Sequence, residues 1–535
     1  MTGLNFDVLR VICRLLTNVP AVLSFSLTCS TLHPVAVERR LSMRAVTIHS
    51  AESVRDLHNY IFVDEKRRGQ HIRAITIPFS DMDPNSSEEL VDRLLAVFES
   101  ASHVRTLSLY VPGSGRHPSL FRHPKVLAAV SNMPRLQELG VVASAGQASE
   151  LLLSNRCRGL KTFRHSDMPV CARHRRDSHI PLLRLARSPL TSTLEEMELT
   201  LDLLEMAAQG HVSFPAVRSV TLTNVEDIFL LDMLLTVFPN LDRTLIVREA
   251  ESIYISHRVA HLRGKNREDA GQNLTLAQSK PLDRVAASAD ILYALGLARP
   301  IRHLTLSMRW NDDHEPQASA TTTSSARALF HEHAPTHLAL VDVRLPHGFS
   351  NLDSMLFPED AVVPRVTHLV LDTTYKNTTI PYDSYDQIPG VYGTTNASWD
   401  AVLDAPLAGL EALPRLTHIR IVVNCEVDLG ASFCAPIHDG ARSFEFDRLV
   451  AALPGIVPSL THIFITSCGR TYTLDGRGRR RGEETWGTSR GWRVQRRPCD
   501  GRGSQGKMHD MEELSGEDAE AVIEREELRA TDRKE

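Results

Sequence analysis

The sequence predicts an α/β protein in which short parallel strands alternate with helices. Three observations predict this class: a strand-like phrase recurs along the chain, helix-like stretches separate its copies, and the length calls for several domains or a repeat array. Of the 535 residues, 42% are hydrophobic but only 6% are aromatic, so Leu, Val and Ile must build the core. This composition suits stacked repeats.

The recurring phrase is an apolar residue, two further residues, and then two apolar residues separated by one other, commonly with Pro before it. The alternation indicates a short strand with one buried face, and the leading apolar residue is expected to enter the same core. Clear copies occupy 72–77, 104–109, 136–141, 194–199, 217–222, 301–306, 366–371, 416–421 and 460–465, and 335–340 is a weaker copy.

Helix-like stretches lie between these copies, so the order is strand, loop and helix. That order predicts parallel strands joined by helical crossovers, in an irregular leucine-rich-repeat-like solenoid and not a doubly wound sheet. Copies are spaced by about 24 to about 60 residues, more loosely than regular leucine-rich repeats. We expect the polar insertions at 266–280, 311–325 and 373–397 to form exposed loops. The helix-like stretches are 88–100, 126–132, 227–238, 286–297, 399–413 and 444–453.

The first 45 residues predict three short helices. Apolar residues recur at intervals of three and four from 4 to 16, where Asn5 is a suitable N-cap and Asp7 lies in the first turn. Pro20 then separates a second helix, which ends near Leu27, and Pro34 begins a third, which ends near Leu41. Three helices of this size have more apolar surface than they can bury among themselves.

The stretch from 4 to 41, with its Leu-x-x-Asp-Val-Leu-x-x-Ile opening and Leu-Ser-Phe-Ser-Leu-Thr-Cys-Ser-Thr-Leu centre, resembles an F-box. Together with the repeats, it resembles fungal F-box proteins of the leucine-rich-repeat-like type. The resemblance implies docking on the Skp-type adaptor of a cullin ubiquitin ligase, with exposed apolar side chains as the contact. The positions that match the docking surface are Leu4, Phe6, Val8, Leu9, Ile12, Leu15, Leu16, Val22, Leu23 and Phe25.

Two departures from the family pattern leave an alternative open. Asn5 replaces the Pro that usually follows the first Leu, and the turn at 17–21 lacks the usual acidic residues. Without adaptor binding, the three helices would be an amphipathic cap on the repeat array, and the chain a leucine-rich-repeat scaffold or interaction protein with no ubiquitin role. In either case we expect the repeat body to bind a target protein, whose identity the sequence does not show.

The composition also limits the function. A net charge of -5 gives no general attraction to nucleic acid or membrane, and eight scattered cysteines are typical of reduced thiols in a cytoplasmic or nuclear protein. No signal peptide or membrane-spanning run is predicted. Phosphate-binding, nucleophile-elbow and zinc-protease motifs do not occur, so we expect a non-catalytic subunit without cofactor or metal.

Histidine is the one unusual local feature. It fills the third position of the phrase in the second half of the chain, and equivalent positions of a parallel ladder stack at about 4.8 Å. These imidazoles could form a pH-sensitive or metal-binding strip, or they could simply recur with the repeat. A second group, Cys157 to His179, has no standard zinc spacing and also holds Arg173, Arg175 and Arg176, which would repel a cation. The phrase histidines are His303, His337, His368, His418 and His462.

The last segment differs in composition from the rest. Its basic first part includes the Gly/Arg run 476–482 and is followed by an acidic end, so the two parts neutralise each other. We therefore predict three parts: an F-box-like helical segment at 1–45, repeats at 46–468, and a mixed-charge, largely flexible tail at 469–535. A closing helix at 515–529 is plausible because Ser515 is a suitable N-cap. RNA binding through the Arg-rich run is a lower-ranked alternative.

Overall fold

The structure is a computed structural model of the whole chain. It describes residues 5–62, 68–78, 88–110, 123–143, 148, 151–152, 157, 159–166, 189–225, 229–249, 259–273, 281–297, 299–308, 316–344, 365–377, 409–428, 446–474, 480–496 and 509–529.

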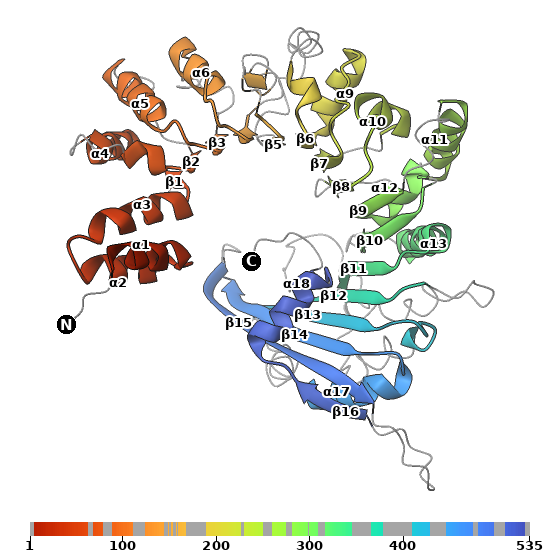
Figure 1. Cartoon of the computed structure of the whole chain (residues 1–535). Helices are drawn as coiled ribbons and strands as arrows, with labels where there is room; N and C mark the ends of the chain where they lie inside the picture. Colours follow the sequence, from red (N-terminus) through yellow and green to blue (C-terminus); the bar gives the residue numbers. More distant parts are fainter. Residues whose placement is uncertain are drawn as a thin grey trace. The chain divides into compact units, whose positions relative to one another are not determined.

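The described chain is α/β, with strands that follow one another in chain order and are mostly parallel (Figure 1). In the described residues, helices lie between many of the successive parallel strands, as the recurring phrase predicts. The chain divides into two compact units, one up to residue 244 and the other from residue 252, with strand β8 (Thr244–Glu249) at the boundary. The recurring phrase does not predict this division, because copies of it occur in both units.

The first unit begins with three helices and continues as a ladder of parallel strands, β1 to β7, in which every described neighbouring pair is parallel. Its strands are β1 (Val46–Thr47), β2 (Ala74–Ile77), β3 (Thr106–Tyr110), β4 (Glu138–Val142), β5 (Thr162–Ser166), β6 (Glu196–Thr200) and β7 (Ser219–Val225). Its helices are α1 (Phe6–Leu15), α2 (Val19–Leu27), α3 (His33–Met43), α4 (Ala51–Phe62), η1 (Arg68–His71), α5 (Glu88–Ser100), α6 (Pro124–Ser131), η3 (Pro189–Ser192), α9 (Leu201–Gln209) and α10 (Leu231–Val237).

The second unit has a parallel part followed by an antiparallel end. Strands β9 to β14 pair in parallel, whereas β15 is antiparallel to β14 and β16 is antiparallel to β15. Its strands are β9 (Leu282–Ser288), β10 (Ile301–Ser307), β11 (His337–Arg344), β12 (His368–Asn377), β13 (His418–Asp428), β14 (His462–Leu474), β15 (Arg480–Arg496) and β16 (His509–Glu513). Its helices are α11 (Val259–Asn273), α12 (Ala289–Leu295), α13 (Pro316–His333), α17 (Phe446–Ile456) and α18 (Gly516–Arg525).

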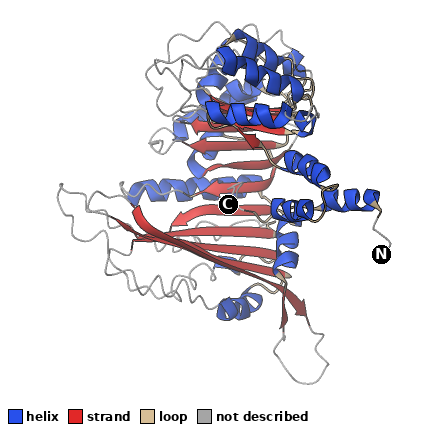
Figure 2. Cartoon of the chain, turned by 90° about the vertical axis from the view of Figure 1, so that its left-hand side faces the viewer, coloured by secondary structure: helices blue, strands red, loops and turns tan. Residues whose placement is uncertain are grey.

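The core forms as the phrase predicts. The leading apolar residue of each clear copy is buried, from Ile72 at 0% exposure to Ile301 at 2%. The strand residues that follow alternate between buried and half-buried, as in β2 and β3. Figure 2 shows these strands side by side with helices packed along them.

The N-terminal helices form as predicted, and α1 has the N-cap that the sequence identifies. The Asn5 side chain accepts a hydrogen bond from the Asp7 backbone N–H, and Asn18 caps α2 in the same way. The Arg39 guanidinium of α3 donates to the Leu16 carbonyl just after α1 at 2.8 Å. A carbonyl at a helix end has no intrahelical partner, so this bond fixes α3 against α1.

The prediction of a largely flexible tail is wrong for most of it. Residues 480–496 form β15, and 509–513 form β16, because the edge of β14 offers unpaired backbone groups that β15 satisfies. The closing helix is present as α18, and Ser515 caps it by accepting from the Asp518 backbone N–H. Of the Gly/Arg run, residues 476–479 lie outside the described residues.

Two of the three predicted loop insertions contain helix. Residues 266–273 belong to α11 and 316–325 belong to α13. The prediction of loops there, which rested on their polar composition, is wrong for these residues. Of the third insertion, 373–377 extends β12 and the remainder lies outside the described residues. Most of the predicted helix 399–413 lies outside them too. Within the described part, no helix combines the length and the apolar character needed to cross a membrane.

The two faces of β15 are covered by different helices. The ring of Trp492 packs near Phe446 of α17, whereas its neighbour Gly491 faces α18. A Cβ at Gly491 would lie 2.9 Å from the Phe464 ring and 3.0 Å from the Ala519 Cβ of α18. This glycine therefore permits close approach of the helix to the sheet.

We predict that Gly491→Ala weakens the docking of α18. The added methyl group must displace Phe464 or Ala519, and overpacking of this kind costs about 1–3 kcal/mol. The matched control is Gly487→Ala on the same strand, where the nearest atom would be 3.7 Å away. Chemical denaturation, with protease sensitivity at α18, measures the effect. Equal stability of the two variants would contradict this account.

Candidate functional site

The five histidines of the phrase stack in one row across β10 to β14. The register pairs His303 with His337, His337 with His368, and so on to His462. Successive ring centroids are 5.4, 4.0, 4.5 and 4.8 Å apart, and the last three pairs are parallel to within 8°. The row of imidazoles that the phrase predicts is therefore present, and we call it the histidine ladder.

A threonine precedes each of the last four ladder histidines and supports the row. Its hydroxyl lies within hydrogen-bond distance of the carbonyl of the preceding strand and of its own histidine's Nδ1. For Thr367 these distances are 3.2 Å to the Thr336 carbonyl and 2.8 Å to His368, and for Thr417 they are 3.0 and 2.9 Å. The pairing Thr-His therefore fixes the position of each imidazole.

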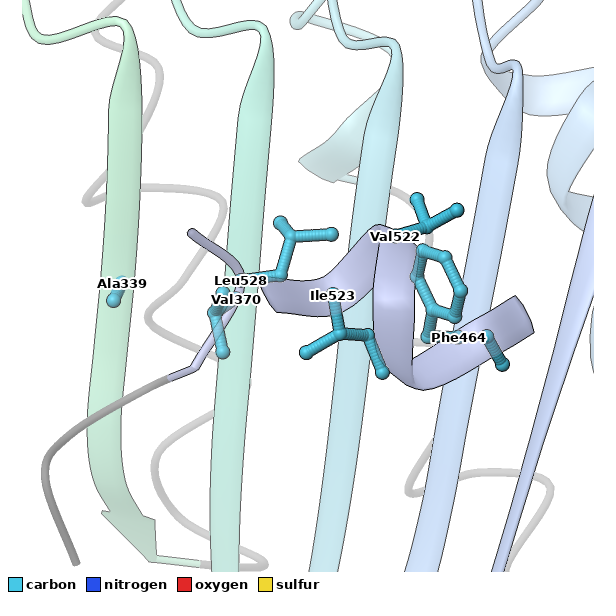
Figure 3. Close-up of a cluster of buried hydrophobic side chains, with 7 residues drawn as sticks. Ala339, Val370, Phe464, Val522, Ile523 and Leu528 are labelled. Atoms are coloured by element: carbon cyan, nitrogen blue, oxygen red, sulfur yellow. The ribbon is translucent and has the colours of Figure 1, made fainter. Parts of the chain in front are cut away.

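The C-terminal helix α18 covers the ladder face of the sheet. Figure 3 shows it crossing the strands with its apolar side chains against them. Fully burying an aliphatic side chain of this size stabilises a fold by about 1.5–3 kcal/mol. The cluster consists of Ala339, Val370 and Phe464 from the strands and Ala519, Val522, Ile523 and Leu528 from the helical segment.

Two consecutive carboxylates at the end of α18 reach the ladder. The Glu527 carboxylate accepts from Arg302 at 2.8 Å and lies 3.4 Å from Nδ1 of His303, while Arg284 is 3.5 Å away. Glu526 Oε2 lies 3.3 Å from Nε2 of His368. Each carboxylate thus contacts a different histidine of the row.

The backbone at the end of α18 supports this arrangement. Glu527 has φ 53°, and Leu528 donates its backbone N–H to the Ile523 carbonyl at 2.9 Å, which is the left-handed Schellman ending of a helix. Glycine usually occupies this position, because a left-handed conformation costs other residues roughly 1–2 kcal/mol. Glu527 adopts this left-handed conformation while its carboxylate forms the ion pair with Arg302.

The electrostatics keep the ladder neutral and the carboxylates charged. Burial lowers the pKa of His303 to about 4, of His337 to about 3 and of His418 to about 4, with neighbouring cations or imidazoles adding to the effect. Burial alone would raise the pKa of Glu527, but hydrogen bonds from Arg302 and His303 hold it at about 2. A hydrogen bond from Arg525 lowers the pKa of Glu526.

The ladder contains a possible metal-ligating group. Within the described residues, His368, His418 and Glu526 each offer one ligand atom, and these atoms lie within 4.8 Å of one another. The recurring phrase contains both histidines but not Glu526, which lies more than a hundred residues further along the chain. No periodicity connects it to them.

The second histidine and cysteine group that the sequence offered does not form a metal site in the described residues. His165 is buried with Nε2 2.9 Å from the Ala143 carbonyl, and the Cys157 thiol donates to the Met133 carbonyl at 2.8 Å. Burial raises the pKa of Cys157 to about 11, so its thiol stays protonated. Cys171, His174 and His179 lie outside the described residues.

The predicted docking positions separate into an exposed and a buried set. Leu9, Leu16 and Phe25 are half-buried, and Leu16 and Phe25 pack on the small core of the first three helices. Val22 is fully buried in that core, so its expected exposure is wrong. Leu4 lies outside the described residues. The exposed members are Phe6, Val8, Ile12, Leu15 and Leu23, and the structure adds Val11 and Leu27.

We predict that removal of residues 515–535 makes the ladder accessible. Because α18 and the two carboxylates cover this face, the histidines His303 and His368 should react with diethylpyrocarbonate several times faster in the shortened chain. A chain that ends after Arg529 is the control, because it retains α18 and Leu528. Mass spectrometry of the modified peptides measures the rates. Similar reactivity in both chains would show that α18 does not shield the ladder.

No protein-family model matches the chain, and no curated protein matches it either.

Proposed function

We propose that the chain is a substrate-receptor adaptor of a Skp-cullin-F-box ubiquitin ligase, docking on the ligase through α1 and α2 and on a target protein through its strand-and-helix body. In this role the chain performs no chemistry. It raises the effective concentration of a target near the ubiquitin-charged enzyme that the complex supplies.

The observation that carries the proposal is the concentration of exposed apolar side chains on the first two helices. Within the described residues nine large hydrophobic side chains are exposed, and seven of them lie on α1 and α2. Leu15 is 73% exposed and Leu27 is 85% exposed. A concentration of exposed apolar side chains of this kind favours a binding site for a partner.

The same surface distinguishes the proposal from a plain cap. A terminal cap of a repeat array has a polar outer face, because that face stays in water. Here the inner face already packs into its own core of Cys13, Val22, Val35 and Ala36, and seven large apolar side chains of the first two helices are still exposed. An amphipathic helix pair with a second apolar face fits the helix-in-groove mode of protein recognition.

The first unit carries a polar row that could serve as the target surface in this proposal. Thr106 and Glu138 on β3 and β4, and Thr162 and Glu196 on β5 and β6, stand in register as a polar row. Each is half-buried or exposed, and the hydroxyl of each threonine lies 3.5 Å from the carboxylate of the next strand. This row would offer hydrogen-bonding groups to a target, and the charge of Glu138 is already paired with Arg164 at 3.1 Å.

We predict that Ile12→Asp combined with Leu15→Asp abolishes co-purification with the Skp-type adaptor. Losing two buried aliphatic contacts at about 1.5–3 kcal/mol each weakens binding by on the order of a hundredfold or more. Both side chains are exposed in the free chain, so thermal unfolding should change little. Co-expression followed by size-exclusion chromatography gives the measurement.

The matched control is Phe62→Asp on α4, which replaces an apolar side chain that is 44% exposed but lies outside the first two helices. It should leave the complex intact. The proposal fails if the unmodified chain purifies as a stable monomer while co-expressed adaptor remains free. In that case a scaffold without a ubiquitin role explains the fold better.

A further inference from the structure

Three potential ligands from distant parts of the second unit converge at one point. His368 begins β12, His418 begins β13, and Glu526 follows the last turn of α18. Their ligand atoms lie within 4.8 Å of one another. Two imidazoles and one carboxylate are a donor set that zinc uses in proteins.

The separation of two of these atoms already suits a metal. Nε2 of His368 and Oε2 of Glu526 are 3.3 Å apart. Two ligands at about 2.0–2.1 Å from a tetrahedral zinc ion are roughly 3.3–3.4 Å apart. The rings of His368 and His418, now parallel to within 5° with centroids 4.5 Å apart, must lean toward each other for His418 to complete the set.

The outer hydrogen bonds are also those of ligating histidines. A metal-bound histidine donates its other ring N–H to an oxygen acceptor, which fixes its tautomer. Here Nδ1 of His368 faces the Thr367 hydroxyl and Nδ1 of His418 faces the Thr417 hydroxyl. Each hydroxyl reaches a backbone carbonyl for its own single proton, so its oxygen is free to accept from Nδ1–H.

The carboxylate is held in place on its other side. Oε1 of Glu526 accepts from Arg525 at 2.8 Å, which leaves Oε2 directed at the histidine. The Schellman ending of α18 and the bond from Arg420 to the Leu528 carbonyl, at 3.2 Å, fix the backbone around it. If the proton of His368 is on Nδ1, then Nε2 carries a lone pair and faces Oε2 of Glu526, which is also an acceptor. A cation between these two atoms would satisfy both.

We propose that His368, His418 and Glu526 bind one divalent cation of the zinc class, which fastens α18 to β12 and β13. Three protein ligands leave a fourth coordination position for water or for a side chain of a bound protein. The hard cation Mg²⁺ should not bind, because it prefers oxygen ligands and keeps its waters. The competing arrangement is a proton on Nε2 donated to Glu526, with no metal.

The test is isothermal titration of the full-length, metal-free protein with Zn²⁺ and, separately, with Mg²⁺. We expect one equivalent of Zn²⁺ to bind at this site and Mg²⁺ to show no uptake there. Glu526→Gln and His418→Gln should each weaken that equivalent at least about tenfold, since even outer-shell changes weaken metal sites by 10–100-fold.

Two control variants separate loss of a ligand from general damage. Glu520→Gln alters an exposed glutamate of α18, and His462→Gln alters a ladder histidine outside the trio. Both should keep Zn²⁺ affinity. Unchanged affinity in Glu526→Gln, or no bound Zn²⁺ in the parent chain, overturns the proposal in favour of the shared proton.

A second measurement tests whether the cation holds α18 on the sheet. Zn²⁺ should slow protease cleavage between β16 and α18 in the parent chain, and a chelator should reverse the effect. Glu526→Gln should be cleaved at one rate with and without Zn²⁺. Equal protection of both chains by Zn²⁺ would place the cation elsewhere and overturn the proposal. These results do not depend on whether the Skp-type adaptor binds.

Discussion

In-register parallel pairing is the constraint on which the rest of this structure depends. Because equivalent residues of successive phrases face each other, one register sets the core, the threonine row and the histidine row together. Each ladder histidine is followed by a buried apolar residue that points to the opposite face of the sheet. These residues are Leu304, Leu338, Leu369, Ile419 and Ile463. A slip of one residue would move these apolar side chains to the face that α18 covers and bring the imidazoles into the helix layer.

Stacking five imidazoles also limits their charge. Protonated rings whose centroids are 4.0–5.4 Å apart would repel one another with little water between them. The lowered pKa of each ladder histidine has burial as its largest cause, so the neutral row is a consequence of coverage by α18 as much as of stacking. A face built this way offers lone pairs and stacking surface, and its positive charge comes from the arginines beside it.

The sequence could predict the parallel strands because each phrase carries its own local pattern. It could also place the five histidines on one face, since their register follows from the phrase alone. Strand β9 was missed because Ala286 and Ala287 stand where larger apolar residues mark the other copies. Strand β15 was missed because arginine and glycine read as linker, although pairing with β14 requires only backbone groups. Glu526 was missed because tertiary packing alone brings it to His368.

The two ends of the chain use apolar helices in opposite ways. Helix α18 has ten residues, too few to be stable alone in water, so its burial on β11 to β14 is what allows it to form. Helices α1 and α2 are equally short, yet they bury one face among themselves and leave a second apolar face in water. At the other end of the chain, Val522 and Ile523 are buried against the sheet, so apolar helix faces in this protein can be covered by its own strands. Because Leu15 and Leu27 remain uncovered, the physical argument for a partner is stronger at the N-terminal helices than anywhere else in the described chain.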